Sequence, residues 1–341
     1  MSKAICILIP RFKKTGPVEV ATILAKEFVD AGNEVHLVSV YDENNAKLNV
    51  KEEKIKVKIL KSIFKVKELR EYIKKEKITV IHSHCMIPDF LNMMLPSDLI
   101  RISTSHNFPQ LDYCYEYGEI KGKIMAWLHL FAFSHLNNVV GCSESVSINL
   151  LELGLKNIST INNGVRIKQD IKDKRIGDKN KALTFVYCGR LIERKNPVLA
   201  YKLFQMIANA NDEFLVCGDG ELMQEMKAIE QRDQRVKILG FIDSPADILE
   251  KSDIFISLSY AEGYPMSVLE ALSFGCNVII SDIPPHLEIK EKHSKSNCIR
   301  IVKLENIGNY EFERNVFPIN NDILSEISSV TMAKNYLKIM N

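Results

Sequence analysis

Short apolar runs alternate with longer amphipathic stretches along the whole chain. The runs lie at residues 4–10, 35–40, 80–84, 100–105 and 139–143, and again at 183–189, 214–218, 236–240, 254–259 and 278–282. Stretches between them, such as 18–32 (VEVATILAKEFVDAG), place apolar residues near positions i, i+3, i+4 and i+7, which is typical of an amphipathic helix. Strands that are apolar on both faces and separated by helices predict parallel sheets built from right-handed βαβ units. Because the pattern occurs twice, we expect two doubly wound α/β domains.

A charged segment separates the two sets of runs. Residues 166–182 (RIKQDIKDKRIGDKNKA) contain few large apolar side chains and precede a fresh strand pattern. The sequence therefore predicts a domain at 1–165, a linker at 166–182, a second domain at 183–325 and a closing helix at 326–341. At 341 residues, the chain exceeds what one core usually organises. Two such domains are expected to face a central cleft at the carboxyl ends of their strands, where nucleotide-like ligands bind.

Composition narrows the class of protein. Hydrophobic residues make up 46% and charged residues 26%, which indicates a globular protein, and the net charge of +2 gives no case for nucleic acid as a partner. The eight cysteines are scattered, without a C-x-x-C pair, and several lie inside apolar runs. They are interpreted as small buried hydrophobes in a reducing cytoplasm. The N-terminus predicts a first strand rather than a signal peptide, and no apolar stretch is long enough to span a membrane.

Residues 51–77 are rich in lysine. They contain eleven Lys or Arg against five Glu, a local net charge of +6. A solvated helix face is one interpretation. The other is a patch that rests on anionic lipid headgroups, which the apolar Ile63, Phe64 and Val66 among the lysines also favour.

A strand–loop–helix pattern at 254–275 suggests an anion site. Glu262 stands at the carboxyl end of the strand, Pro265 suits the first helical turn, and Glu270 falls about one turn into the helix. Backbone amides near the start of a helix are natural donors to an anion, and here they belong to Gly263, Tyr264, Met266 and Ser267. With a diphosphate at this helix start, Glu270 would accept hydrogen bonds from ribose hydroxyls.

Two further strand ends offer matching chemistry. Gly189, Arg190 and Lys195 follow the strand at 183–188, where a glycine allows close backbone approach and the cations suit phosphate. The next strand ends in a Gly-Asp-Gly turn at 218–220. Surface charges and a plain tight turn are the alternative interpretations of these two loops.

Residues 183–290 resemble the donor-binding domain of the retaining glycosyltransferases of family 4, which have the GT-B fold of two Rossmann-like domains. The resemblance rests on GRLIERKNP, VCGDGEL, VKILGFI, SDIFISLSYAEGYPMSVLEALSFGCNVIISD and HLEI, in matching order and spacing. The first half is similar through ATILAKEFVDAGNEVHLVS, VIHSHCMIPD, STSHN, VVGCSES and STINNGV. The resemblance thus covers nearly the whole chain.

The resemblance implies a role for each candidate residue. Arg190 and Lys195 would hold the diphosphate of a nucleotide sugar, Glu270 the ribose, and Glu262 the transferred sugar. The remaining donor-binding candidates are Gly189, Gly263, Tyr264, Pro265, Met266 and Ser267, with Leu239 and Ile242 beside the base and Gly16 from the first domain. His84 and His106 are the first-domain candidates near sugar and acceptor. The family needs no metal, and no cofactor is expected beyond the donor, a UDP-sugar being favoured over a GDP-sugar.

The sequence also departs from the family pattern. The first βα loop contains only Gly16 where a Gly-Gly pair is usual, which puts first-domain contacts to the donor in doubt. Pro284 and Pro285 replace glycines in a loop beside the expected cleft, and Asn277 stands where proline is usual.

These features predict a metal-independent hexosyltransferase that retains the anomeric configuration. Its expected acceptor is a lipid-linked glycan of bacterial O-antigen or capsule synthesis, and its expected place is the cytoplasm, with peripheral contact to the inner membrane face. Two alternatives stay open: a sugar-nucleotide epimerase of the same fold, and a non-catalytic family member that acts as a partner subunit.

Overall fold

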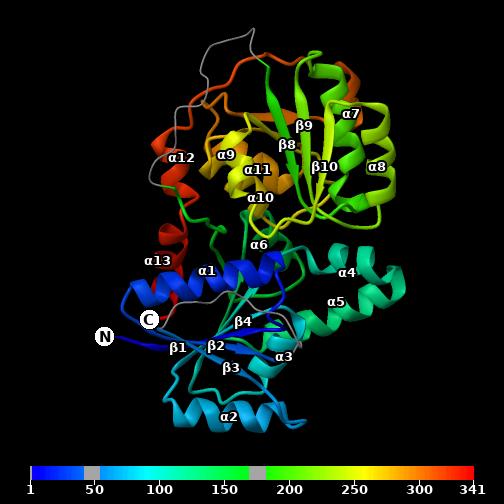
Figure 1. Cartoon of the computed structure of the whole chain (residues 1–341). Coiled ribbons are helices and arrows are strands. Elements are labelled where there is room, and N and C mark those ends of the chain that lie inside the picture. Colours follow the sequence, from blue (N-terminus) through cyan, green and yellow to red (C-terminus); the bar gives the residue numbers. More distant parts are fainter. Residues whose placement is uncertain (1, 42–53, 169–181) are drawn as a thin grey trace. The chain divides into compact units, whose positions relative to one another are not determined.

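The computed structural model describes residues 2–41, 54–168 and 182–341, which form two compact units, Met1–Gly164 with Ser329–Asn341 and Val165–Ser328. Each unit contains one parallel sheet between helices (Figure 1). The predicted fold class of two doubly wound α/β domains is therefore confirmed. Most of the predicted linker lies outside the described residues.

The first unit is built on a seven-stranded sheet in the order β3-β2-β1-β4-β5-β6-β7. Its strands are β1 (Ala4–Ile9), β2 (Glu34–Ser39), β3 (Ile55–Ile59), β4 (Val80–His84), β5 (Ile100–Ser105), β6 (Asn138–Gly141) and β7 (Ile158–Thr160). Its helices are α1 (Gly16–Asp30), α2 (Lys65–Lys75), α3 (Met86–Met93), α4 (Pro109–Tyr117), α5 (Glu119–Ser134), α6 (Glu144–Glu152) and α13 (Ser329–Ile339). Side chains of α2 and α3 pack against Cys6 and Leu8 of β1, while α1 lies on the opposite side of the sheet (Figure 1).

The second unit repeats the design with six parallel strands in the order β10-β9-β8-β11-β12-β13. Its strands are β8 (Thr184–Cys188), β9 (Glu213–Cys217), β10 (Val236–Gly240), β11 (Ile254–Ser257), β12 (Asn277–Ser281) and β13 (Ile299–Val302). Its helices are α7 (Pro197–Ile207), α8 (Met223–Arg232), α9 (Ala246–Lys251), α10 (Met266–Ser273), α11 (Pro284–Lys292) and α12 (Asn321–Glu326), with short 3-10 turns at Glu193–Lys195 and Leu304–Asn309.

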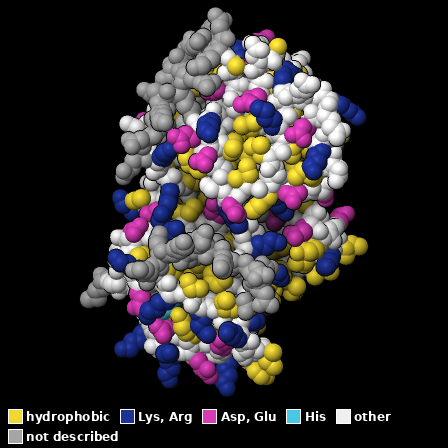
Figure 2. All heavy atoms as spheres, viewed as in Figure 1, with side chains coloured by type: hydrophobic (Ala, Val, Ile, Leu, Met, Phe, Trp, Pro, Cys, Tyr) yellow, Lys and Arg dark blue, Asp and Glu magenta, His cyan; other side chains and the backbone are white. Residues whose placement is uncertain are grey.

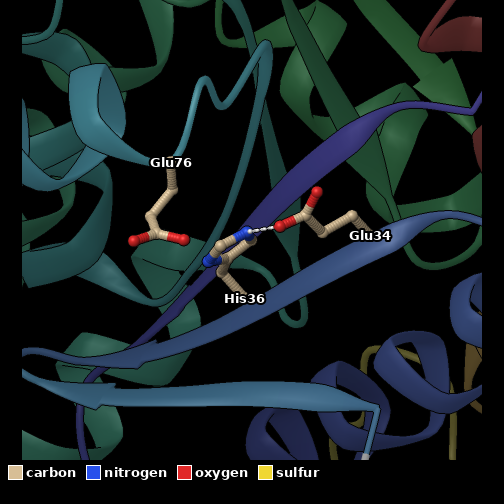
Figure 3. A group of neighbouring side chains, drawn as sticks. All are labelled: Glu34, His36 and Glu76. Atoms are coloured by element: carbon tan, nitrogen blue, oxygen red, sulfur yellow. Dashed lines mark hydrogen bonds and ion pairs between the residues drawn. The ribbon is translucent and has the colours of Figure 1, made fainter.

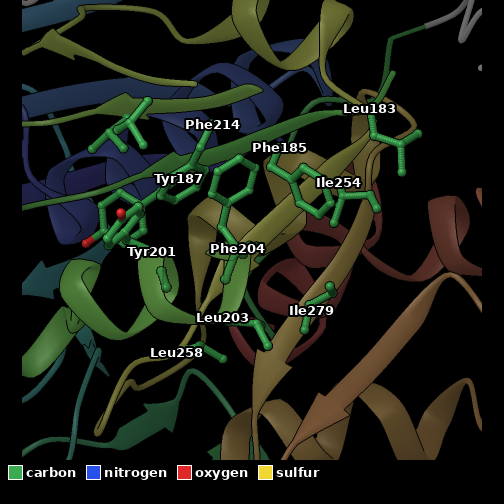
Figure 4. Packing of buried hydrophobic residues seen from close by; sticks show 14 of the residues in the cluster. Leu183, Phe185, Tyr187, Tyr201, Leu203, Phe204, Phe214, Ile254, Leu258 and Ile279 are labelled. Atoms are coloured by element: carbon green, nitrogen blue, oxygen red, sulfur yellow. The ribbon is translucent and has the colours of Figure 1, made fainter. Parts of the chain in front are cut away.

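Large apolar side chains fill the space between α7 and the second sheet (Figure 4). The ring of Phe204 lies between Phe185 and Phe214, with centroid separations of 5.3 and 5.2 Å. Burial of such rings is a main source of core stability. This core fixes β8 and β9, whose carboxyl ends supply two of the predicted site loops.

The Lys-rich stretch is not one solvated helix. Its described part forms the edge strand β3, a turn at Leu60–Phe64 and helix α2. In β3 apolar and lysine residues alternate (IKVKI), but only Ile55 is buried and Val57 is exposed, as an edge position allows. Residues 51–53 lie outside the described part of the chain.

Both predicted site regions lie at topological switch points, where the order in which successive strands join the sheet reverses. In the first unit this point lies between β1 and β4, beside Gly16 and His84; in the second it lies between β8 and β11. Such switch points leave room for a ligand at the carboxyl ends of the strands. The expected cleft between the domains stays a prediction.

Candidate functional site

Glu262 is the centre of the second unit's switch point. It lies in the loop that follows β11 and is buried, although it is charged. Its Oε1 accepts hydrogen bonds from the ammonium of Lys195 and from the hydroxyl of Ser259, the latter at 2.7 Å. The Arg194 guanidinium lies 3.9 Å from its Oε2 and donates to the carbonyl of Ala261 at 2.7 Å. Lys195 and Glu262, two predicted site residues 67 positions apart, are thus brought into direct contact.

These neighbours keep Glu262 ionised. Burial raises the pKa of its carboxyl, but the charges of Lys195 and Arg194 outweigh burial, so that the net shift of the pKa is downward. A buried carboxylate of this kind accepts hydrogen bonds and does not serve as a proton donor at neutral pH. That property suits the binding of hydroxyl groups.

Hydrogen bonds from Ser281 and His286 hold the backbone just before the Glu262 loop. The hydroxyl of Ser281, at the end of β12, donates to the carbonyl of Ser259 at 2.7 Å and lies 2.9 Å from Nδ1 of His286 on α11. Burial lowers the pKa of His286 to about 4, so the ring is neutral at physiological pH. His286 therefore fixes the loop through hydrogen bonds and adds no charge beside Glu262.

The loops that follow β8 and β9 are interlocked. The amide of Leu191 donates to the carbonyl of Asp219, and the amide of Leu222 donates to the carbonyl of Leu191, both at 2.9 Å. A Cβ at Gly218 would overlap the carbonyl of Gly189, so this close approach requires a glycine. The hydroxyl of Tyr187 donates to the carbonyl of Arg190 at 2.9 Å, which fixes the backbone there while the Arg190 side chain stays exposed.

Helix α10 begins directly after the loop that contains Glu262. Pro265 occupies the cap position just before Met266, one place earlier than the sequence suggested, and its carbonyl accepts from the amides of Val268 and Leu269. Within the described chain, the amides of Met266 and Ser267 have no hydrogen-bond partner. Gly263, Tyr264 and Pro265 are buried beneath them, and the partly buried Glu270 lies one turn further along. The start of α10 therefore presents two amides that can donate hydrogen bonds, and the binding of an anion there stays a prediction.

The end of β10 contacts the loop that follows β9. The amide of Gly218 donates to the carbonyl of Gly240 at 2.8 Å. Leu239 directly precedes Gly240 and Ile242 follows it by two positions, and Leu239 is exposed at an irregularity in the strand register. The predicted base-binding residues thus belong to the same group of loops as Gly189 and Arg190.

The first unit holds a cluster of three histidines, of which His82 and His84 are buried and His106 is partly buried. Nδ1 of His84, at the end of β4, lies 2.8 Å from Nε2 of His106, which follows β5. The ring of His82 lies beside that of His84, with centroids 4.3 Å apart and planes tilted by 40°. Nε2 of His82 bonds the hydroxyl of Thr104, which in turn bonds Tyr336 of α13. Burial lowers the pKa of each of the three histidines, so the cluster is neutral at physiological pH. The sequence predicted His84 and His106 separately, and the structure brings them together.

The other first-unit candidate, Gly16, is the first residue of α1 and is exposed. A Cβ at this position would meet no other atom, so the structure gives no steric reason for a glycine there.

One group of described residues has the spacing of a metal site, namely Glu34, His36 and Glu76 (Figure 3). The ammonium of Lys56, however, lies 2.6 Å from Glu34 and 2.8 Å from Glu76, and its hydrogen bonds lower the pKa of both carboxyls. Tyr72 bonds the second ring nitrogen of His36 at 2.9 Å. The group is an ion-pair network around Lys56 and gives no reason to assign a metal.

Sequence reasoning missed three residues around Glu262. Arg194 stands next to the predicted Lys195, and Ser259 ends a predicted strand, so both lay within reach of the sequence pattern. His286 lies 24 positions beyond Glu262 and begins the HLEI motif of the resemblance, but its contact with Ser281 becomes visible only in the structure.

Comparisons with known proteins agree in both halves of the chain. Residues 168–301 match the family model of glycosyl transferases group 1, and residues 15–169 match that of Glycosyltransferase Family 4. Over 251 residues, 67% of this chain, the sequence is 29% identical to the UDP-Gal:alpha-D-GlcNAc-diphosphoundecaprenol alpha-1,3-galactosyltransferase of Escherichia coli. This match spans 64% of that enzyme's length, slightly less than two thirds.

Two further similarities extend over more of the chain. The O-antigen biosynthesis glycosyltransferase WclY of Escherichia coli is 26% identical over 81% of this chain and 79% of its own length. The crystal structure of Anabaena Alr3699/HepE in complex with UDP-glucose superposes with a TM-score of 0.77 at 14% identity, covering 98% of both chains. At this identity the second similarity concerns the fold alone.

Proposed function

From the two family matches, which together span residues 15–301, we infer that the chain is a GT-B glycosyltransferase, and we propose that it transfers a hexose from a UDP-sugar to a hydroxyl of a lipid-linked glycan, with retention of anomeric configuration. The pathway we propose is bacterial O-antigen or capsule synthesis. The observation that supports transfer most directly is the buried contact of Glu262 with Lys195 beside the start of α10. It combines an acceptor for sugar hydroxyls with donors and a cation for phosphate.

The donor's diphosphate is proposed to bind between the start of α10 and the two cations Arg190 and Lys195. The amides of Met266 and Ser267 and the two side chains supply the positive electrostatic potential that stabilises the leaving group, so no metal is required. Glu270, one turn into α10, would accept hydrogen bonds from the ribose.

Glu262 is proposed to bind hydroxyls of the transferred sugar. Its carboxylate is held by Ser259 and Lys195 and stays ionised, which favours a binding role over that of a nucleophile. Retention would then follow from displacement on one face of the sugar. The bond from the anomeric carbon to the phosphate oxygen breaks, the acceptor oxygen bonds to that carbon, and its proton passes to the departing phosphate. The roles of His84, His106 and Gly16 toward sugar and acceptor stay predictions.

Calorimetric titration with UDP, GDP, ADP and CDP tests the donor pocket. We expect UDP to bind most tightly, and we expect Glu270→Ala to weaken it at least ~10-fold because the ribose loses a charged acceptor. Glu225→Ala, at an exposed position on α8, is the matched control. Equal UDP affinity in wild type and Glu270→Ala would contradict this assignment.

The same preparation separates transfer from its two alternatives. Incubation with a UDP-sugar and a lipid-linked disaccharide analogue should release UDP only when the acceptor is present. An epimerase would change the sugar nucleotide without an acceptor, and a non-catalytic subunit would release nothing.

We further propose that the protein works peripherally at the inner face of the membrane. Among the described residues no helix has both the length and the hydropathy needed to cross a bilayer. The first unit, however, contains 23 Lys and Arg against 18 Asp and Glu, whereas the second contains 22 against 25. The excess positive charge is concentrated at 51–77, and Figure 2 shows Lys and Arg side chains gathered around α2. Such a distribution would attract the first unit to anionic headgroups.

A further inference from the structure

The turn between β3 and α2 exposes two large apolar side chains. Ile63 and Phe64 are neighbours in sequence, and their side chains are 88% and 68% exposed. Both follow Leu60, which is buried. The chain therefore turns outward at this point.

Hydrogen bonds hold this turn in one conformation. The carboxylate of Glu68, on the first turn of α2, accepts from the amides of Lys61 and Ser62 at 2.9 and 2.8 Å and from the ammonium of Lys58 at 2.7 Å. The hydroxyl of Ser62 accepts from the amide of Phe64 at 3.0 Å. Because the backbone is fixed by these bonds, the exposure of Ile63 and Phe64 does not come from a loose loop.

The side chains around the turn are cationic. Lys61, Lys65 and Lys67 lie within four positions of Ile63, and residues 61–67 contain no acidic side chain. Lys65 is tied back, since its ammonium donates to the carbonyl of Leu60 at 2.9 Å, whereas Lys61 and Lys67 are exposed. The exposure of two large apolar side chains to water is unfavourable, and here lysines surround them.

We infer that Ile63 and Phe64 insert into the headgroup region of an anionic bilayer while Lys61 and Lys67 contact lipid phosphates. Two side chains are too few for a stable protein interface, which buries some 20–30 residues a side. Apolar residues beside cations are instead the combination that binds at a charged membrane interface. The inference deepens the proposed peripheral location by naming its contact, and it does not depend on the identity of the donor or acceptor.

Sedimentation of the full chain with vesicles tests the contact. Vesicles of phosphatidylcholine with 30% phosphatidylglycerol should bind the wild type, and pure phosphatidylcholine vesicles should bind it far less. The double variant Ile63→Ser/Phe64→Ser should lower the partition coefficient ~10-fold, and Lys61→Gln/Lys67→Gln should lower it by roughly fivefold per charge. The matched control, Ile148→Ser/Leu151→Ser, removes two half-exposed apolar side chains of α6 in the same unit and should bind as the wild type does.

The single tryptophan provides an internal check on the position of the contact. Trp127 lies on α5, is 65% exposed and belongs to an apolar face with Ile120, Ile124 and Phe131. If the inference is correct, Ile63→Ser/Phe64→Ser shows this loss of vesicle binding, while Ile124→Ser/Trp127→Ser binds as the wild type does. Loss of binding in the α5 variant with full binding in the turn variant, or equal binding to neutral vesicles, would overturn it.

UDP titration of the same variants keeps the two hypotheses apart. Ile63→Ser/Phe64→Ser should bind UDP with wild-type affinity, because the turn lies in the first unit whereas Arg190, Lys195 and Glu270 lie in the second. Vesicle binding by a wild type that fails to bind any nucleotide would refute the donor assignment and leave the inference about the turn intact.

Discussion

Replacing Lys195 by methionine should destabilise the second unit in a pH-dependent manner. The substitution removes the ammonium that contacts Glu262 but keeps a side chain of similar length. Glu262 then stays buried with Ser259 and the more distant Arg194 as its remaining partners. Removing one partner of a fully buried ion pair costs about 3–5 kcal/mol. Because the Lys195 side chain is 19% exposed and Arg194 remains, we expect about 2–3 kcal/mol at pH 7.

The sign of the pH dependence follows from the two pKa shifts. In the wild type the folded-state pKa of Glu262 lies below its unfolded value, so the contribution of the ion pair is present above the unfolded pKa and is lost as the pH falls through the folded pKa. In Lys195→Met, burial acts with less opposition and should raise the folded-state pKa above the unfolded value. Protonation then favours the folded state, and the loss relative to wild type should shrink as the pH falls from 7 toward 5.

Hydrogen exchange read by mass spectrometry is the suitable assay. The only tryptophan, Trp127, lies in the first unit and would not report on the second. Peptides that span β11 and α10 give the local opening free energy at pH 7 and, after correction for intrinsic exchange rates, at pH 5. Lys202→Met, at an exposed position on α7, is the matched control.

A double-mutant cycle then isolates the ion pair. Lys195→Met/Glu262→Gln should recover most of the loss at pH 7, because the amide removes the unpaired charge. An identical loss at both pH values, or strict additivity of the two substitutions, would refute the reasoning that an uncompensated carboxylate causes the instability.

Three further outcomes follow from the described geometry. Gly218→Ala should lower the free energy of unfolding by about 3 kcal/mol or more, because the new Cβ would overlap the Gly189 carbonyl. Urea titrations followed by circular dichroism measure this loss. A smaller loss than that of the exposed control Gly308→Ala would contradict the interlocked turn. Tyr336→Phe should cost about 1–2 kcal/mol, measured by Trp fluorescence in the first unit, since Thr104 loses a buried hydrogen bond; an unchanged midpoint would show that this bond is dispensable. His286→Gln should flatten the rise of stability between about pH 4 and 6.5, because the folded-state pKa of this histidine is lowered to about 4 and its unfolded form binds a proton first; an unaltered pH profile from hydrogen exchange would exclude a buried neutral ring.

Much of the architecture could be predicted because it depends on local patterns. Each of the ten apolar runs overlaps a strand of the structure, and the run at 80–84 coincides with β4 (Val80–His84). Three short strands were not predicted: β3, β7 and β13. Of these, β3 and β7 lie at the edges of their sheet, as does β13 in the other, and edge strands need apolar residues on fewer positions. Their sequences therefore differ less from those of loops and helices.

The candidate site divides in the same way. Sequence order alone put Arg190, Lys195 and Glu262 at strand ends, where a parallel sheet gathers its loops. The direct bond of Lys195 to Glu262, the pairing of His84 with His106 and the support from His286 arise only when distant segments pack together. Burial lowers the pKa of His286, and it makes the ionised state of Glu262 depend on the charges of Lys195 and Arg194. Burial is likewise a property of the packed chain. Periodicity is local and is determined by the sequence itself, whereas distance and dielectric environment depend on contacts between remote residues and were decided by the tertiary structure alone.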